Sequence, residues 1–69
     1  MYQGPFLPKA DLVTGEYYRG HCRNAPIAKW LGDRFVYLRT KFGHTFAEEI
    51  KHPDDDKTFD VFFPTEKLT

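Results

Sequence analysis

The sequence contains a single cysteine among its 69 residues and carries no excess charge of either sign. One cysteine cannot form a disulfide within the chain, and it excludes a four-cysteine zinc site and CxxC redox chemistry. The ten basic residues are balanced by ten acidic residues. This balance argues against a protein that binds chiefly by neutralising phosphates, because such proteins normally carry a basic excess.

Long apolar runs are also missing. No segment approaches the roughly 20 apolar residues of a membrane-spanning helix, and residues 1–5 lack the charged region and apolar stretch of a secretion signal. We therefore expect a soluble, cytoplasmic protein with no membrane partner. The hydrophobic content of 41% and the aromatic content of 17% are typical of a folded domain. A chain this short buries only about 60% of the surface that its unfolded form exposes, so its core is thin.

Turn-forming residues divide the chain into an arm, one domain and a tail. Pro5 and Pro8 predict an extended arm over residues 1–10, because proline fixes φ and lacks an amide hydrogen. A single small β domain is expected over residues 11–64, followed by a loose tail over residues 65–69. Within the domain, strand-forming residues gather in five short segments with turn residues between them: 16–23, 27–31, 34–42, 45–51 and 59–63. Gly20, inside the first of these, predicts a bulge or bend.

The segment near residues 46–51 allows two interpretations. Thr45 and Glu48 have the spacing of a capping box, which favours a short helix. A strand would instead place Phe46, Glu48 and Ile50 on one side, and we favour the strand because so short a helix is marginal. The sequence thus predicts a mainly β fold, an antiparallel meander curled into a small SH3-like or OB-like barrel. The alternative is an α+β fold in which the helix covers one face of the sheet.

The two parts of the chain differ in charge. Residues 1–45 contain seven basic and three acidic side chains, whereas residues 46–69 contain three basic and seven acidic ones. One interpretation is that the two parts pair and complement each other across strands. The other is a molecule with two charged poles, able to meet an anionic and a cationic partner.

Aromatic and basic side chains share one face of each of two expected strands. Alternation groups the odd-numbered residues of segment 16–23, and it does the same in segment 34–42. If the strands are neighbours with these faces aligned, their rings and guanidinium groups form a solvent-facing platform. The candidate binding residues of this platform are Tyr17, Arg19, Arg23, Phe35, Tyr37, Arg39 and Lys41.

The alternative is that Phe35 and Tyr37 belong to the core and that the basic residues merely flank it. In segment 34–42 the opposite face then carries Val36, Leu38 and Phe42. Trp30 is expected in the core or as a lid over it, because of its size.

Catalytic and metal chemistry find little support in the sequence. His21 and Cys22 are neighbours and point to opposite faces of a strand, so we interpret Cys22 as a small core residue. The spacing of Cys22, His44, His52 and the carboxylates at 54–56 matches no compact metal template. Glu48 and Glu49 are adjacent and diverge on a helix or a strand, which leaves no acid–base pair. We expect no enzymatic activity, no metal and no cofactor.

Several short segments resemble small uncharacterised proteins of bacteria and their phages: 20–25, 41–43, 52–56 and 59–62. The resemblance implies a cytoplasmic, accessory role, and it brings no activity, cofactor or catalytic residue with it. Small size, aromatic content and the uneven charge favour a non-catalytic module that binds another protein as an accessory or modulator of a host factor. The alternative is single-stranded nucleic-acid binding through the aromatic and basic strand face. A homodimer is a further partner that this charge distribution allows.

Overall fold

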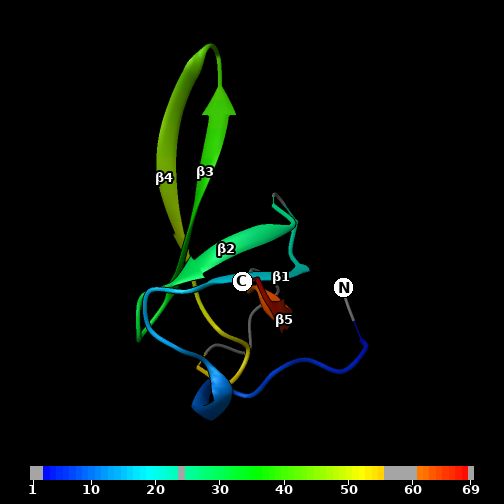
Figure 1. Cartoon of the computed structure of the whole chain (residues 1–69). Coiled ribbons are helices and arrows are strands. Elements are labelled where there is room, and N and C mark those ends of the chain that lie inside the picture. The colour runs from blue at the N-terminus through cyan, green and yellow to red at the C-terminus, as the bar shows by residue number, and fades with distance from the viewer. Residues whose placement is uncertain (1–2, 24, 56–60, 69) are drawn as a thin grey trace.

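The computed structural model describes residues 3–23, 25–55 and 61–68 and is built of strands with one short 3-10 helix (Figure 1). The mainly β prediction is confirmed. The segment near 46–51 lies in a strand, and no α-helix occurs in these described ranges, so the short helix and the α+β alternative are wrong. The elements are η1 (Lys9–Asp11), β1 (Tyr17–His21), β2 (Ile27–Trp30), β3 (Phe35–Lys41), β4 (His44–Ile50) and β5 (Phe63–Lys67).

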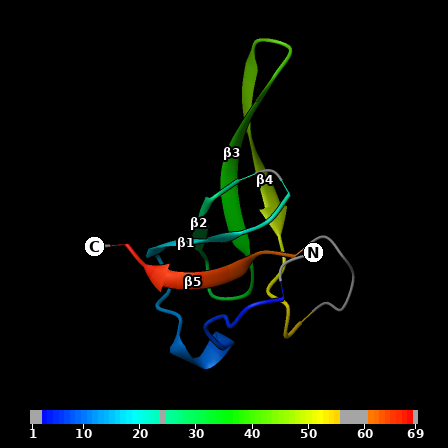
Figure 2. The ribbon, with the colours of Figure 1, turned by 90° about the vertical axis from the view of Figure 1, so that its right-hand side faces the viewer.

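The five strands form one antiparallel sheet in the order β4-β3-β2-β1-β5. β1 to β4 are the expected meander, and β5 returns to pair with β1. The sheet is curled, because the β3–β4 hairpin stands upright while β1 and β5 cross beneath it (Figures 1 and 2). Within the described ranges β4 and β5 do not pair, and a single parallel bridge between Lys51 and Val61 joins the segments beside them. The curl therefore stops short of a closed barrel.

The predicted irregularity at Gly20 is present in β1. The register between β1 and β5 shifts between Arg19 and Gly20. A side chain at Gly20 would place its Cβ 2.1 Å from the carbonyl oxygen of Phe63 and 2.9 Å from the ring of Phe62. Glycine lets β5 approach β1 this closely because it has no Cβ.

The core is a cluster of aromatic side chains around Phe35. The rings of Trp30 and Phe62 each lie 4.7 Å from the ring of Phe35, and Tyr18 meets it edge-on at 6.4 Å. All four side chains are buried, which confirms the expectation for Trp30. Tilted and edge-to-face contacts of this kind add to the hydrophobic stabilisation of a thin core.

The arm packs beneath this core. The amide of Leu7 donates to the carbonyl oxygen of Pro64 over 2.7 Å, and the ring of Phe6 meets the ring of Phe63 edge-on. His52 is fully buried and its Nε2 lies 2.9 Å from the carbonyl oxygen of Leu7. The amide of Asp54 donates to His52 Nδ1 over 3.0 Å. With Nδ1 as the acceptor of this bond, Nε2 is the ring nitrogen that faces the arm and can donate to it.

The expected boundary of the tail is wrong. Residues 65–67 belong to β5, and the side-chain hydroxyl of Thr65 donates to the carbonyl oxygen of Arg19. Pro64 is compatible with this strand because β5 is at the sheet edge, where a missing amide hydrogen is tolerated. Of the strand predicted over 59–63, residues 59 and 60 lie outside the described residues, Val61 forms an isolated bridge and only Phe63 belongs to β5. Helices that are long and apolar enough to cross a membrane are absent from the described ranges.

Candidate functional site

The expected platform of aromatic and basic side chains is not formed. β2 separates β1 from β3, so the two strands are not neighbours. The register pairs Tyr17 with Lys29 and Lys29 with Val36, which places Tyr17 on the face opposite Phe35 and Tyr37. Phe35 is fully buried and Tyr37 is only 6% exposed. The alternative, in which both rings belong to the core, is therefore the correct one.

The cations expected on the platform lie on different sides of the molecule. Arg19 is on the outer face of β1, where it forms an ion pair with Glu66, and Arg23 is exposed beyond the end of β1. Lys41 closes the β3–β4 hairpin, with its Nζ 5.5 Å from the centre of the Phe42 ring. These three cations do not form one surface.

Arg39 belongs to a small polar network on the inner side of the hairpin. Its guanidinium lies 3.2 Å from a carboxylate oxygen of Glu48, and the hydroxyl of Tyr37 donates to the same carboxylate over 2.7 Å. Arg39 and Tyr37 were both predicted to bind a partner, but here their polar groups bind Glu48 of the same chain.

The uneven charge along the sequence is largely internal complementarity. Four ion pairs each join a base from residues 1–45 to an acid from residues 46–69, as one of the two interpretations expected. They are Lys9–Asp55, Arg19–Glu66, Arg34–Glu49 and Arg39–Glu48. The two parts therefore neutralise each other across the fold rather than forming separate poles.

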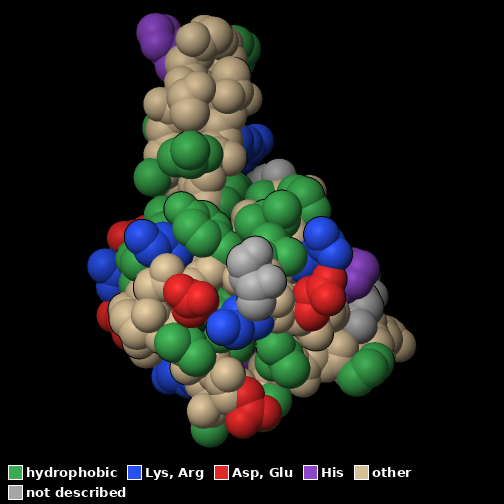
Figure 3. Space-filling model, in the orientation of Figure 1, with side chains coloured by type: hydrophobic (Ala, Val, Ile, Leu, Met, Phe, Trp, Pro, Cys, Tyr) green, Lys and Arg blue, Asp and Glu red, His purple; other side chains and the backbone are tan. Residues whose placement is uncertain are grey.

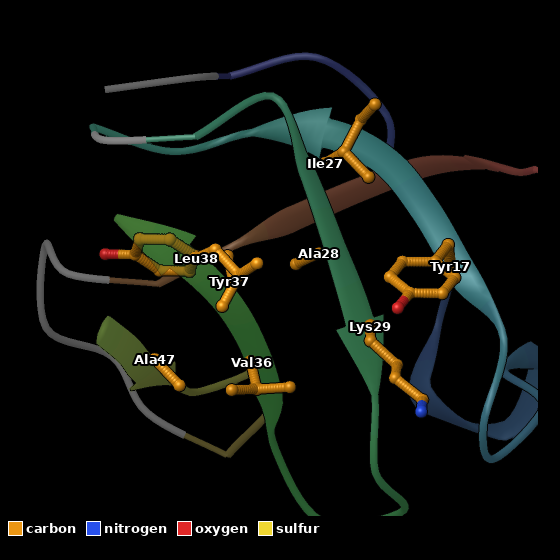
Figure 4. Close-up of a pocket in the computed structure, with 8 residues that line it drawn as sticks. All are labelled: Tyr17, Ile27, Ala28, Lys29, Val36, Tyr37, Leu38 and Ala47. Atoms are coloured by element: carbon orange, nitrogen blue, oxygen red, sulfur yellow. The ribbon is translucent and has the colours of Figure 1, made fainter. Parts of the chain in front are cut away.

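The outer face of the sheet carries an apolar hollow of about 430 Å³ (Figure 4). It arises where β3 leaves β2. The β2–β3 ladder has only the pairs Lys29–Val36 and Trp30–Phe35, whereas the β3–β4 ladder continues to Lys41–His44. The lining residues are Tyr17, Ile27, Ala28, Lys29, Val36, Tyr37, Leu38 and Ala47.

The side chains around this hollow are unusually accessible for apolar groups. Leu38 is 74% exposed, Tyr17 is 52% exposed and Ile27 is 40% exposed. The space-filling view shows hydrophobic side chains gathered where the hairpin joins the body of the molecule (Figure 3). Because exposed apolar side chains gather here, we take the hollow as the candidate functional site.

One cation stands beside the hollow. The ammonium of Lys29 lies 5.8 Å from the centre of the Tyr17 ring, and it has no carboxylate partner among the described residues. The hollow thus combines apolar walls with an available positive charge. This arrangement can bind an apolar group that carries a carboxylate next to it.

Sequence reasoning named Tyr17 and Tyr37 as binding residues and missed the other lining residues. A signal existed, because alternation in β3 groups Val36 with Leu38. The same alternation does not place Phe42 with them, since Phe42 and Gly43 form a two-residue turn with φ of 53° and 79°. The hollow itself could not be read from the sequence, because it depends on where the β2–β3 ladder ends.

The residues considered for catalysis are held in structural contacts. The thiol of Cys22 lies 3.1 Å from the carbonyl oxygen of Ala25 and packs against the core, and His52 is buried between the arm and Trp30. His44 lies at the hairpin turn. In the part of the chain that the structure describes, no group of three potential metal ligands comes together.

Comparisons with protein-family models, curated protein sequences and solved structures find no match for this chain.

Proposed function

We propose that this protein is a non-catalytic protein-binding module that uses the outer face of its sheet. The observation that carries the proposal is the apolar hollow, with Leu38 exposed at the foot of the hairpin. Beyond Val36 the hairpin has only two strands, and a two-stranded ribbon in water is marginally stable by itself. A partner that covers the hollow would bury Leu38 and support the hairpin in one step.

The proposal assigns the protein a cytoplasmic role as an accessory or modulator of a host factor. The resemblance of several short segments to small bacterial and phage proteins supports this placement. Aromatic side chains such as Tyr17, surrounded by exposed aliphatic groups, are typical of the central residues in protein interfaces.

Single-stranded nucleic-acid binding is the weaker alternative. It needs stacking rings and available cations on one surface. Phe35 and Tyr37 are buried, and the guanidiniums of Arg19 and Arg39 are engaged by Glu66 and Glu48. Fluorescence anisotropy with labelled single-stranded DNA and RNA at low salt tests it, and salt-dependent binding would favour this alternative over a protein partner.

The test of the proposed function compares two leucine substitutions. Leu38→Asp places a charge in the hollow, whereas Leu31→Asp changes a leucine that is 37% exposed between β2 and β3 and does not line the hollow. Each purified variant is used to capture proteins from a lysate of the source cells, treated with nuclease, and the bound proteins are quantified by mass spectrometry.

We expect the amount of a protein captured by the wild type and by Leu31→Asp to fall about tenfold or more with Leu38→Asp, because the aspartate would have to be buried without a partner for its charge. The affinity of the purified partner for the three proteins is then measured directly. Circular dichroism of each variant establishes that it is folded. Equal capture by Leu38→Asp and the wild type would show that the hollow is not the binding surface.

A further inference from the structure

We propose that the partner is bound as an extended strand along the free edge of β3, with an apolar side chain in the hollow and a neighbouring carboxylate paired with Lys29. This inference rests on the proposed function and specifies the mode and chemistry of binding. It predicts a partner segment in which apolar residues alternate with others and at least one residue is Asp or Glu.

The hairpin geometry shows which backbone groups of β3 are available. The pair Lys41–His44 flanks a two-residue turn, so these residues bond to each other, and every second residue back along β3 does the same with β4. Leu38 and Thr40 therefore direct their amide and carbonyl groups away from β4. β2 pairs with β3 only at Phe35 and Val36, so these groups have no strand partner within the described residues.

A row of free amide and carbonyl groups is a template for another strand. An extended peptide that pairs with Leu38 and Thr40 would continue the sheet beyond the point where β3 leaves β2. Its alternate side chains on the outer face would lie against Leu38 and above Ile27 and Val36, which line the hollow. The backbone supplies affinity in this mode, and the hollow selects an apolar side chain.

Lys29 supplies the charge preference. Its ammonium lies over the Tyr17 ring and has no carboxylate partner among the residues that the structure describes. The nearby carboxylates of Glu49 and Glu16 are paired with Arg34 and Lys67. An acidic residue beside the apolar one in the partner would therefore meet an available cation rather than compete for one.

Two other occupants fit the edge less well. A second copy that pairs its own β3 with this one would bring residues 37–41 to the seam, and these contain no carboxylate for Lys29. The outer edge of β4 presents Thr45, Ala47 and Glu49, and a charged residue on an edge strand opposes pairing. The β3 edge is the one that adjoins the hollow.

The experiment begins with displayed random peptides selected on the wild-type protein. A selected peptide is synthesised in its natural form and with N-methyl groups on alternate amides, which block strand pairing and leave the side chains unchanged. We expect selected peptides to alternate apolar residues and to contain Asp or Glu. N-methylation of the amides that face β3 should weaken binding about tenfold or more, because it removes two backbone hydrogen bonds.

Two proline substitutions identify the edge. Thr40→Pro removes an amide donor from the free edge of β3, and Thr45→Pro removes one from the free edge of β4. Thr40 and Thr45 are cross-strand partners whose hydroxyl oxygens lie 3.0 Å apart, so both variants lose the same side-chain contact. We expect Thr40→Pro to weaken peptide binding about tenfold or more and Thr45→Pro to leave the affinity within about threefold of the wild type.

The charge preference is tested separately. Lys29→Glu should lower the affinity for peptides that contain Asp or Glu about tenfold.

Each contrary result has a distinct meaning. Selection of peptides without the alternating acidic pattern, or of none, overturns the inference, while the proposed function still depends on capture by Leu31→Asp and loss with Leu38→Asp. Binding that is lost with Leu38→Asp but unaffected by N-methylation shows side-chain docking without strand pairing. If only Thr45→Pro abolishes peptide binding, the peptide pairs with the edge of β4 and the inference is wrong. Concentration-dependent dimers in light scattering that Thr40→Pro abolishes would make a second copy the occupant.

Discussion

The body of the molecule and the β3–β4 hairpin are built from the same kinds of residue but differ in what surrounds them. β3 belongs to both, because it begins at Phe35 in the core and ends at Lys41 beside the turn. Phe35 is fully buried, whereas Phe42, only seven residues later, is 88% exposed. Stability therefore resides in the body, whereas the hairpin leaves apolar side chains and a backbone edge exposed.

The two regions also differ in the sequence distance over which their contacts act. The hairpin is held by the ladder from Phe35–Ile50 to Lys41–His44, which joins neighbouring strands. The body is closed by contacts between distant segments, such as Leu7 with Pro64 and His52 with the arm. A change in the body is therefore expected to affect the whole fold, and a change near the turn is expected to stay local.

The largest expected difference between the body and the hairpin is in the free energy of unfolding lost when Phe35 or Phe42 is replaced by alanine. Phe35→Ala should cost about 3–5 kcal/mol, because it removes the ring at the centre of the core and leaves a cavity. A domain of this size rarely has more than about 3–5 kcal/mol to lose, so most molecules should unfold. Phe42→Ala should change the free energy of unfolding by less than about 0.5 kcal/mol. Urea denaturation of both variants measures this contrast, and similar losses would contradict it.

Replacing Gly20 in the body and Gly43 in the hairpin by alanine should give a smaller difference in stability, again with the larger loss in the body. Gly20→Ala should cost about 1–3 kcal/mol or more, because its Cβ would collide with the backbone of β5 at Phe63. Gly43→Ala meets no atom within 4 Å, but its φ of 79° is unfavourable for alanine and should cost about 1 kcal/mol. Thermal unfolding compares the two. A larger loss for Gly43→Ala would place the critical packing in the hairpin rather than in the body.

The smallest expected effect concerns the contact between η1 and the turn after His52. The hydrogen bond from Lys9 to Asp55, over 2.7 Å, holds the pKa of the Asp55 carboxyl below its ordinary value of 3.8. Because the folded state favours the carboxylate, this contribution to stability is present above pH 3.8 and is lost as the pH falls through the lower pKa of the folded state.

Asp55→Asn should therefore make the loss of stability below pH 3.8 slightly shallower, as measured by urea denaturation across an acid pH series. Lys9→Ala is the matched variant, because it removes the other partner and should reduce the same slope. A slope that is unchanged in both variants would show that the contact does not contribute to acid unfolding.

Much of the fold was predictable because it depends on local properties of the chain. The spacing of turn residues predicts the meander, and Gly20 predicts the irregularity in β1 that the register confirms. The extension of β5 past Pro64 was not predictable in this way, because it requires β1 to be in place as a partner. The candidate site was predicted less well, since only Tyr17 and Tyr37 of the hollow were named as binding residues.

The reason lies in what alternation can encode. The odd-numbered residues of β3 share a side, as expected, but a period of two does not say which side is buried. Phe35 and Tyr37 are inside because Trp30, His52 and Phe62 pack against that side of β3. Because Leu38 lies on the opposite side of β3, it is exposed to solvent.

The sequence by itself determined a β meander, the positions of its turns and the grouping of side chains along each strand, because these follow from backbone preferences within a few residues. Only the tertiary structure decided which face of β3 is buried, that β5 continues past Pro64, and that the β2–β3 ladder stops early enough to leave a hollow beside Leu38. These features depend on contacts between segments far apart in the chain, and such contacts leave no periodic signal in any one of them.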